Sequence, residues 1–273
     1  MNEFISDTAD WRRFDTFQGL VDSYEDTLEI HTAIRDDFFT RVLNDIELIT
    51  LRRWILANQH GYGETQFYWM WNLIAKELPQ DFKMLEVGVY RGQIPALMTL
   101  LTGRYGITGN IVGVTELSTI GFGDTHPGDP DFAEDIAKTF AFAKQPMGNF
   151  RVVQGNSMDE DVIYTTSLEA PFDLVYIDGG HEYHEVVSDI KNYAEMVKDG
   201  GLLVIDDASC SLNLPFEASS VSPIGTIENR NSHYSKGLDE VTQAVEELVT
   251  TDPRFTEIFA VGHNRVWRYN EVV

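Results

Sequence analysis

The sequence predicts an α/β fold: a doubly wound, mainly parallel sheet with helices on both faces, preceded by a helical extension and finished by an antiparallel hairpin. Short apolar runs without polar alternation indicate the strands, namely KMLEVG, NIVGVTE, FRVVQGN, FDLVYID and GLLVIDD. Helical segments between such runs favour right-handed crossovers and parallel pairing. Near the end of the chain, FTEIFAVGHNRVWRY contains two strand-like runs joined by a turn signal, which predicts the hairpin.

The chain divides into a helical extension or cap, residues 1–80, and an α/β domain, residues 81–273. In the extension, large apolar side chains recur near the helical period, for example at Phe14, Phe17 and Val21. The pattern changes at the KMLEVG run, where the first strand is expected. The extension itself matches no motif that indicates a function.

Three longer segments connect or follow the predicted strands. Between the last two apolar runs, side chains from Tyr183 to Val197 share one helical face, and KDGG is a typical helix terminator. Residues 121–148 are longer than an ordinary connection, so we expect an insertion that partly covers the site. Residues 211–236 form a second long segment rich in turn-forming residues. Both would lie near the carboxyl edge of the sheet, where such folds bind ligands.

The charge balance limits the classes of partner. Forty-four acidic residues face twenty Lys and Arg, giving a formal net charge of −24. Such a surface repels phosphate backbones and anionic lipid heads, so we expect neither nucleic acid nor membrane as a partner. Cys210 is the single cysteine, which excludes an intrachain disulfide. The sequence has no signal-peptide pattern and no apolar stretch of membrane-spanning length, which predicts a cytoplasmic protein.

The first chemical motif is EVGVYRGQ, directly after the first predicted strand. It contains Glu86, Gly88, Tyr90 and Gly92. Glycines at this point let the backbone approach a ligand, although a tight turn without a ligand is the alternative. A carboxylate suits a cationic amino group and not a phosphate. The motif therefore favours S-adenosylmethionine over a dinucleotide.

Two further motifs follow the second and third strands. Glu116 ends the second strand, where an acid can accept hydrogen bonds from two ribose hydroxyls; a surface acid in an acidic chain is the alternative. Asn156, Ser157 and Met158 follow the third strand and are expected to line an adenine pocket. An ordinary turn would explain these three residues nearly as well.

The last two parallel strands end in carboxylates at the same edge of the sheet: Asp178, Asp206 and Asp207. Three acids held this close repel one another unless a cation lies between them. Oxygen ligands suit a hard divalent ion such as Mg²⁺. In the alternative, Asp178 binds polar groups of a ligand, Asp207 caps a turn and no metal is present.

His181 lies three residues after Asp178, at the start of a predicted helix. The positive end of the helix disfavours imidazolium, so a neutral ring near pH 7 can accept a proton. A hydrogen-bonded structural histidine is the alternative. His184 lies on a different face of the helix and is expected to have a structural role.

Taken in order, EVGVYRGQ, GNS, YIDGGHEY and GGLLVIDD resemble the metal-dependent class I O-methyltransferases, whose Rossmann-like fold also ends in a hairpin. The likeness is greatest to bacterial enzymes that methylate sugar hydroxyls of natural products, the macrocin, mycinamicin and aminocoumarin type; the catechol type is more distant. It covers roughly residues 60–210. The resemblance implies cofactor contacts from Glu86, Gly88, Tyr90 and Gly92, a metal on Asp178, Asp206 and Asp207, and His181 in the slot that holds the base.

The resemblance also implies a function: Mg²⁺-assisted transfer of a methyl group from S-adenosylmethionine to a hydroxyl of a small molecule, such as a sugar or vicinal diol. Gly63 and Glu64 fall where the family has a loop that covers the cofactor. The N-terminal helices are expected to shape the acceptor pocket or to form a dimer interface. Two alternatives remain, an NAD-dependent oxidoreductase and a non-catalytic S-adenosylmethionine-binding protein. The chain lacks the Tyr-x-x-x-Lys pair that is typical of one large dehydrogenase class, and Glu86 suits a phosphate group poorly. Both observations count against the oxidoreductase.

Overall fold

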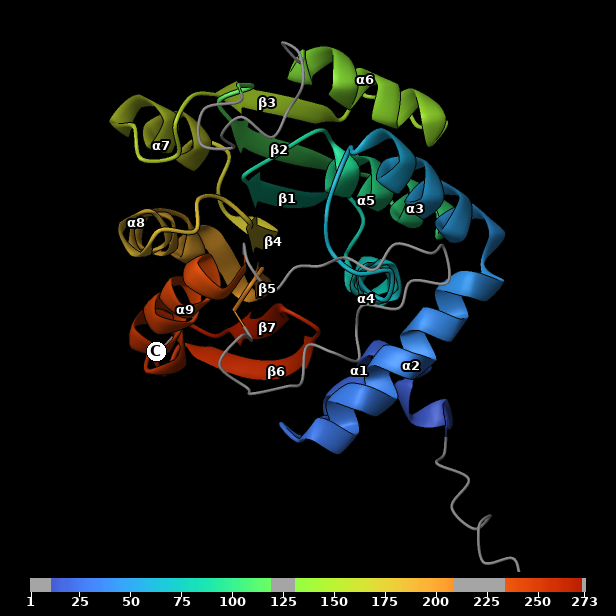
Figure 1. The fold of residues 1–273 in the computed structure, drawn as a ribbon. Helices are drawn as coiled ribbons and strands as arrows, with labels where there is room; N and C mark the ends of the chain where they lie inside the picture. The colour runs from blue at the N-terminus through green and yellow to red at the C-terminus, as the bar shows by residue number, and fades with distance from the viewer. Residues whose placement is uncertain (1–10, 119–130, 209–233, 272–273) are drawn as a thin grey trace, which may run out of the picture.

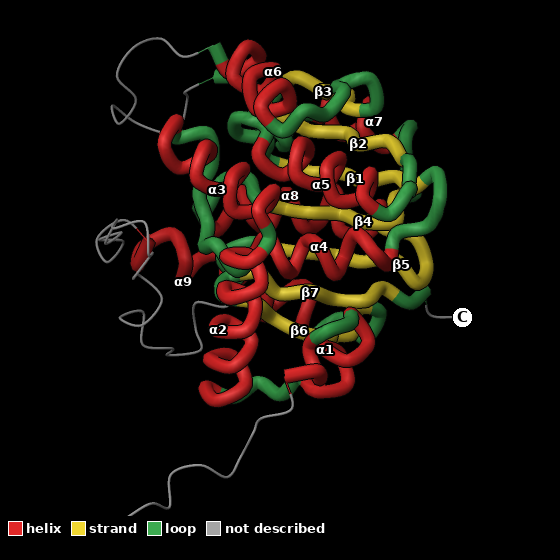
Figure 2. The backbone as a smooth tube through the Cα atoms, turned by 90° about the vertical axis from the view of Figure 1, so that its right-hand side faces the viewer, coloured by secondary structure: helices red, strands yellow, loops and turns green. Residues whose placement is uncertain are grey.

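The computed structural model describes residues 11–118, 131–208 and 234–271, which form one seven-stranded sheet with helices on both faces (Figure 1, Figure 2). The strands are β1 (Phe82–Val87), β2 (Gly109–Thr115), β3 (Phe150–Gln154), β4 (Phe172–Ile177), β5 (Val197–Ile205), β6 (Phe255–Val261) and β7 (Asn264–Tyr269). Their spatial order is β3-β2-β1-β4-β5-β7-β6. Strands β1 to β5 pair in parallel, and β7 runs antiparallel to both β5 and β6. The predicted doubly wound sheet and its final hairpin are confirmed.

Several helices precede the first strand, and the remaining ones connect the strands. In the described residues they are η1 (Trp11–Phe14), α1 (Phe17–Ser23), α2 (Leu28–Asn44), α3 (Ile46–Asn58), α4 (Phe67–Glu77), α5 (Gln93–Arg104), α6 (Phe132–Phe142), α7 (Glu160–Ser167), α8 (Tyr183–Tyr193), the short turn η3 (Ala194–Met196), α9 (Tyr234–Val245) and the π-helical turn η5 (Glu246–Thr250). No helix of this described part is long and apolar enough to cross a membrane.

Two hydrophobic cores lie on opposite faces of the sheet (Figure 1). One is built with α1 to α6 and the other with α7, α8 and α9. The N-terminal helices belong to the first core: Trp71 of α4 packs edge-on against Tyr176 of β4 with ring centroids 4.9 Å apart, and Phe17 of α1 packs against Phe259 of β6 at 5.4 Å. Removing these helices would therefore expose one face of the sheet to water.

The helix predicted from Tyr183 to Val197 is shorter in the structure. α8 ends at Tyr193, and the KDGG segment lies inside β5. Val197 is buried and pairs with Phe172 of β4, with an irregularity in the register that follows. Pairing with β4 therefore outweighs the local terminator signal, and Gly200 takes φ 75° within the strand.

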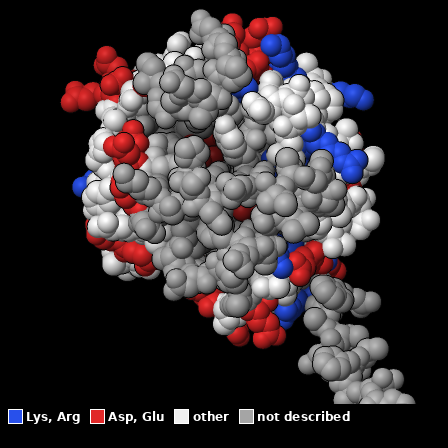
Figure 3. All heavy atoms as spheres, viewed as in Figure 1, with Lys and Arg blue, Asp and Glu red and all other residues white. Residues whose placement is uncertain are grey.

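The topology brings the predicted motifs to one edge. The chain leaves β1 toward β2 and β3 on one side and continues from β4 to β5 on the other. Such a switch point leaves a crevice at the carboxyl ends of the strands, where ligands bind in this architecture. On the face shown in Figure 3, acidic side chains are prominent on the side formed by α7, α8 and α9, and basic ones gather on the opposite side.

Candidate active site

The first loop, residues 88–92, follows β1 and contacts the turn after β4. Gly88 has φ 99°, and a Cβ there would lie 1.9 Å from the carbonyl oxygen of Asp178. Only glycine allows this approach. The N–H groups of Gly88 and Val89 both donate to the Val114 carbonyl of β2, at 3.0 and 3.2 Å. The first predicted motif is thus held directly beside the predicted acids.

Glu86 is a buried carboxyl group near the end of β1, only 3% exposed. Burial raises its pKa to about 8. Its Oε2 has no hydrogen-bond partner among the described residues. A buried polar atom without a partner is costly, and a ligand is one way to satisfy it. The position fits a group that meets the cationic part of a ligand.

Glu116 and Asn156 lie next to each other after β2 and β3. Asn156 donates through Nδ2 to Oε1 of Glu116 at 2.9 Å, and its Oδ1 accepts from the backbone N–H of Met158 at 2.9 Å. The carbonyl of Ser157 accepts from the hydroxyl of Tyr193 at 2.7 Å. The structure therefore brings the four predicted residues, Glu116 and residues 156–158, together in one hydrogen-bonded group.

Asp178 and Asp206 lie side by side beyond β4 and β5. Their N–H groups continue the parallel ladder, donating to Val87 at 2.8 Å and to Ile177 at 3.0 Å. The hydroxyl of Tyr176 donates to Oδ2 of Asp178 at 2.9 Å. Burial, followed by the charge of Asp206, raises the pKa of Asp178 well above its ordinary value, and burial also raises the pKa of Asp206. Oδ1 of Asp206 has no hydrogen-bond partner in the described part of the chain.

Asp207 turns away from its neighbour and lies between two histidines. It is 2% exposed and has φ 55°, a left-handed conformation that Asp tolerates better than most residues. Its Oδ2 is 3.4 Å from Nε2 of His181, and its Oδ1 is 3.4 Å from Nδ1 of His263. Nε2 of His263 is in turn 3.4 Å from Oε1 of Glu64. These four side chains form a continuous polar chain, whose His181 end is 47% exposed.

His263 is the site residue that sequence reasoning missed. It lies in the turn of the β6–β7 hairpin, where Val261 pairs with Asn264. β7 is antiparallel to β5, with Arg265 opposite Ile205. The residues just before Arg265 must therefore lie beside those just after Ile205. The GHN turn, combined with the position of the hairpin next to β5, was the signal that could have located His263.

The three predicted metal carboxylates do not converge on one point. Among the described residues, no group of three His, Cys, Asp or Glu side chains is arranged to hold a metal ion. Asp207 instead has its two carboxylate oxygens 3.4 Å from His181 and His263. The chemistry of the donors nevertheless suits a hard cation, because Asp178 and Asp206 are buried oxygen donors and the charge of Asp206 raises the pKa of Asp178.

None of the other described histidines belongs to the chain of polar contacts from Glu64 to His181. His184 is exposed and pairs with Glu182 at 3.5 Å, away from the sheet edge. His126, His233 and Cys210 lie outside the described residues, as do residues 121–130 of the expected insertion and residues 211–233 of the second long segment. Within 121–148, the described part contains α6.

Comparison with known proteins identifies the segment that carries these features. Residues 85–208 match the family model described as a methyltransferase domain. That segment contains every predicted cofactor and acid position, whereas Glu64 and His263 lie outside it. An uncharacterised protein of Acanthamoeba polyphaga mimivirus is 23% identical over 168 residues, covering 60% of this chain and 70% of that protein.

Solved structures show the same fold at low sequence identity. An O-methyltransferase from Bacillus cereus in complex with SAH has a TM-score of 0.52 and 15% identity, over 82% of this chain and 90% of that one. A SAH-bound methyltransferase from Podospora anserina has a TM-score of 0.55 and 14% identity, over 82% and 88%. An O-methyltransferase from Streptomyces achromogenes involved in tomaymycin synthesis, in complex with SAM, has a TM-score of 0.52 and 16% identity, over 82% and 90%.

Proposed function

We propose that this chain, a class I S-adenosylmethionine-dependent methyltransferase by its domain match and fold, methylates a hydroxyl group of a small molecule, a sugar or a vicinal diol. The observation that carries the proposal is the contact between the first loop and the turn after β4 at Gly88. In our proposal the first loop binds the cofactor and so holds it beside the carboxylates, with His181 three residues after Asp178. Hydroxyl methylation needs these groups together: a methyl donor, a site for the acceptor oxygen and a base.

The cofactor is held along the carboxyl edge by groups suited to its parts. Oε2 of Glu86, which has no hydrogen-bond partner among the described residues, accepts a hydrogen bond from the amino group of the methionine part. Glu116, fixed by Asn156, accepts from the ribose hydroxyls. Ser157 and Met158, together with Asn156, line the adenine pocket. Burial of Glu86 strengthens its interaction with a cation, because the local dielectric is low.

Asp178, Asp206 and Asp207 would hold Mg²⁺ with their carboxylate oxygens. The ion would lower the pKa of the acceptor hydroxyl and fix the direction of attack. Support comes from the donor chemistry: two neighbouring buried carboxyl groups with raised pKa and an oxygen of Asp206 without a partner in the described residues. Asp207 would have to turn part of its carboxylate from the two histidines toward its neighbours.

His181 accepts the proton of the acceptor hydroxyl. Nε2 of His181 faces Asp207, so Nδ1 is the atom that accepts the proton. The carboxylate of Asp207 then stabilises the imidazolium that forms. The acceptor oxygen attacks the sulfonium methyl in line, so that the O–CH₃ bond forms as the S–CH₃ bond breaks. The electron pair stays on sulfur, giving neutral S-adenosylhomocysteine. The exposed side of His181 then returns the proton to water.

The cofactor is tested first, by calorimetry with S-adenosylhomocysteine, NAD and Mg²⁺. We expect binding of S-adenosylhomocysteine and of Mg²⁺, and none of NAD. Binding of NAD alone would instead indicate an oxidoreductase. Binding of S-adenosylhomocysteine without turnover of any sugar or diol in a substrate screen would indicate a non-catalytic binding protein.

The base is tested with His181→Ala. Turnover should fall by about 10²-fold or more while affinity for S-adenosylhomocysteine stays unchanged. His184→Ala is the matched control, because this exposed histidine lies three residues further on and away from the site. Unchanged turnover in His181→Ala would remove the residue from the mechanism.

A further inference from the structure

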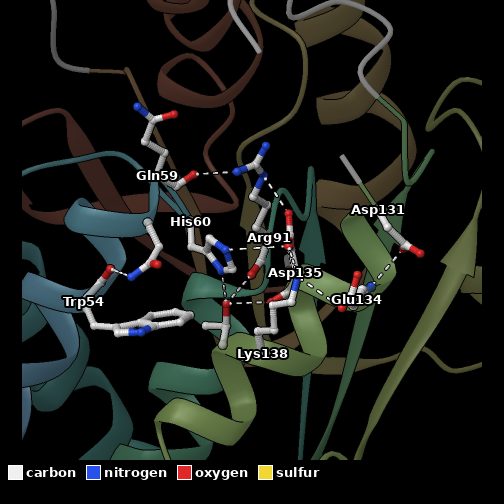
Figure 4. A network of polar contacts seen from close by, with 10 residues as sticks. Trp54, Gln59, His60, Arg91, Asp131, Glu134, Asp135 and Lys138 are labelled. Carbon is white, nitrogen blue, oxygen red and sulfur yellow. Dashed lines mark hydrogen bonds and ion pairs between the residues drawn. The ribbon is translucent and has the colours of Figure 1, made fainter. Parts of the chain in front are cut away.

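A buried ion pair anchors the first loop to α6 (Figure 4). Arg91 lies in this loop and is only 8% exposed. Its Nε is 3.3 Å from Oδ2 of Asp135, and its Nη1 donates to the carbonyl of Gln59 at 3.2 Å. Asp135 is also 8% exposed. The pair thus joins three segments distant in sequence: the end of α3, the first loop and α6.

Thr139 makes a second connection, one turn further along α6. Its buried hydroxyl lies 2.7 Å from the carbonyl oxygen of Arg91 and 2.8 Å from Nδ1 of His60. Burial lowers the pKa of His60, so the ring is neutral near pH 7. Nε2 of the same ring is 3.7 Å from Oδ1 of Asp135. The main chain and the side chain of Arg91 are therefore both fixed by α6.

Apolar contacts complete the same face of α6. The guanidinium of Arg91 lies 5.1 Å from the ring centroid of Phe132, and the ring of Tyr90 meets Phe132 edge-on at 5.2 Å. A Cβ on Gly92 would lie 3.2 Å from Cα of Ile136. Phe132, Asp135, Ile136 and Thr139 have the i, i+3, i+4, i+7 spacing of one helical face. That face is occupied by the first loop.

We infer that Arg91 and Asp135 are positioning residues that hold the first loop in its cofactor-binding conformation, and that α6 thereby sets affinity for the cofactor and not the choice of acceptor. The inference rests on the proposed function, in which Tyr90 and Gly92 contact S-adenosylmethionine. Asp135 acts through Arg91, whose backbone continues directly into both contact residues.

Asp135→Asn tests the ion pair while preserving the shape of the side chain. The dissociation constant for S-adenosylhomocysteine, measured by calorimetry, should rise about tenfold, the size of a typical coupling between sites. KM for S-adenosylmethionine should rise by a similar factor, with KM for the acceptor and affinity for Mg²⁺ unchanged. Lys138 pairs with both Asp135 and the exposed Glu134, each at 3.2 Å. Glu134→Gln is therefore the matched control, and this variant should bind S-adenosylhomocysteine normally.

Two further variants separate positioning from folding. Thr139→Val removes only the hydroxyl that faces Arg91, and should weaken S-adenosylhomocysteine binding in the same direction without disturbing the charges. Arg91→Gln combined with Asp135→Asn leaves no unpaired buried charge, so its loss of affinity should be smaller than the sum of the two single losses.

The outcomes are distinct. Unchanged affinity for S-adenosylhomocysteine in folded Asp135→Asn and Thr139→Val would show a purely structural network and overturn the inference. A raised KM for the acceptor with normal cofactor binding would place α6 on the acceptor side, which also overturns it. A wild-type protein that does not bind S-adenosylhomocysteine would reject the proposed function, and the inference with it.

Discussion

Replacement of the buried carboxyl group near the end of β1, Glu86→Gln, should change how stability depends on pH. Burial raises the pKa of Glu86 to about 8 from an ordinary 4.5. The folded protein therefore keeps a proton that the unfolded chain has released. Stability from this group is fully present below pH 4.5 and is lost as the pH rises toward 8. At about 1.4 kcal/mol per unit over about 3.5 pH units, the loss is at most about 5 kcal/mol.

The assay is urea unfolding of wild type and Glu86→Gln at pH 5, 6, 7 and 8. Both proteins share the other carboxyl groups whose pKa is raised by burial. Subtracting the two stability curves therefore removes most of the contribution of those groups. The wild type should lose stability relative to the variant as the pH rises, by up to about 4 kcal/mol from pH 5 to pH 8. Glu77→Gln, an exposed position at the end of α4, is the control and should follow the wild type. Parallel curves for wild type and Glu86→Gln would refute a carboxyl group held neutral by burial.

Three other changes probe the same edge of the sheet. His263→Asn removes the ring that orients Asp207 and should reduce turnover about tenfold or more, with S-adenosylhomocysteine affinity in calorimetry unchanged; equal turnover would exclude a positioning role. Gly88→Ala should destabilise the fold and abolish cofactor binding, because its Cβ would meet the Asp178 carbonyl at 1.9 Å; a normal melting temperature would contradict this contact. Asp206→Asn removes a negative charge next to Asp178, so the metal-free protein should melt at a higher temperature in EDTA, while its affinity for Mg²⁺ should fall. A lower melting temperature in EDTA would contradict repulsion between Asp178 and Asp206.

The parts of the fold that depend on pattern and topology were predictable from the sequence. Continuous apolar runs separated by helices fix a parallel sheet, and parallel strands bring their carboxyl ends to one edge. The proximity of Asp178 to Asp206, and of Glu116 to Asn156, follows from that rule without any knowledge of side-chain packing. The contact of the first loop with Asp178 follows too, since β1 and β4 are neighbours at the switch point.

The parts that depend on pairing between distant segments were not predictable in this way. KDGG has the composition of a helix terminator, yet pairing with β4 makes it part of β5. The interaction of Glu64 with His263 joins the segment before α4 to the final hairpin. No local pattern contains such a contact. The orientation of Asp207 toward two histidines likewise depends on its left-handed backbone conformation. No sequence pattern predicts that conformation for an aspartate at this position.

The long insertion illustrates how a local prediction can be correct about structure and incomplete about role. An insertion was expected in residues 121–148, and its described part contains α6. From its position in the sequence, this insertion was expected to cover part of the site. The face of α6 that carries Phe132, Asp135 and Ile136, however, packs against Tyr90, Arg91 and Gly92. Because the first loop packs against this face of α6, the face is not free to contact an acceptor. Differences in acceptor choice between this chain and its structural relatives should therefore be sought along the polar chain from Glu64 to His181, outside α6.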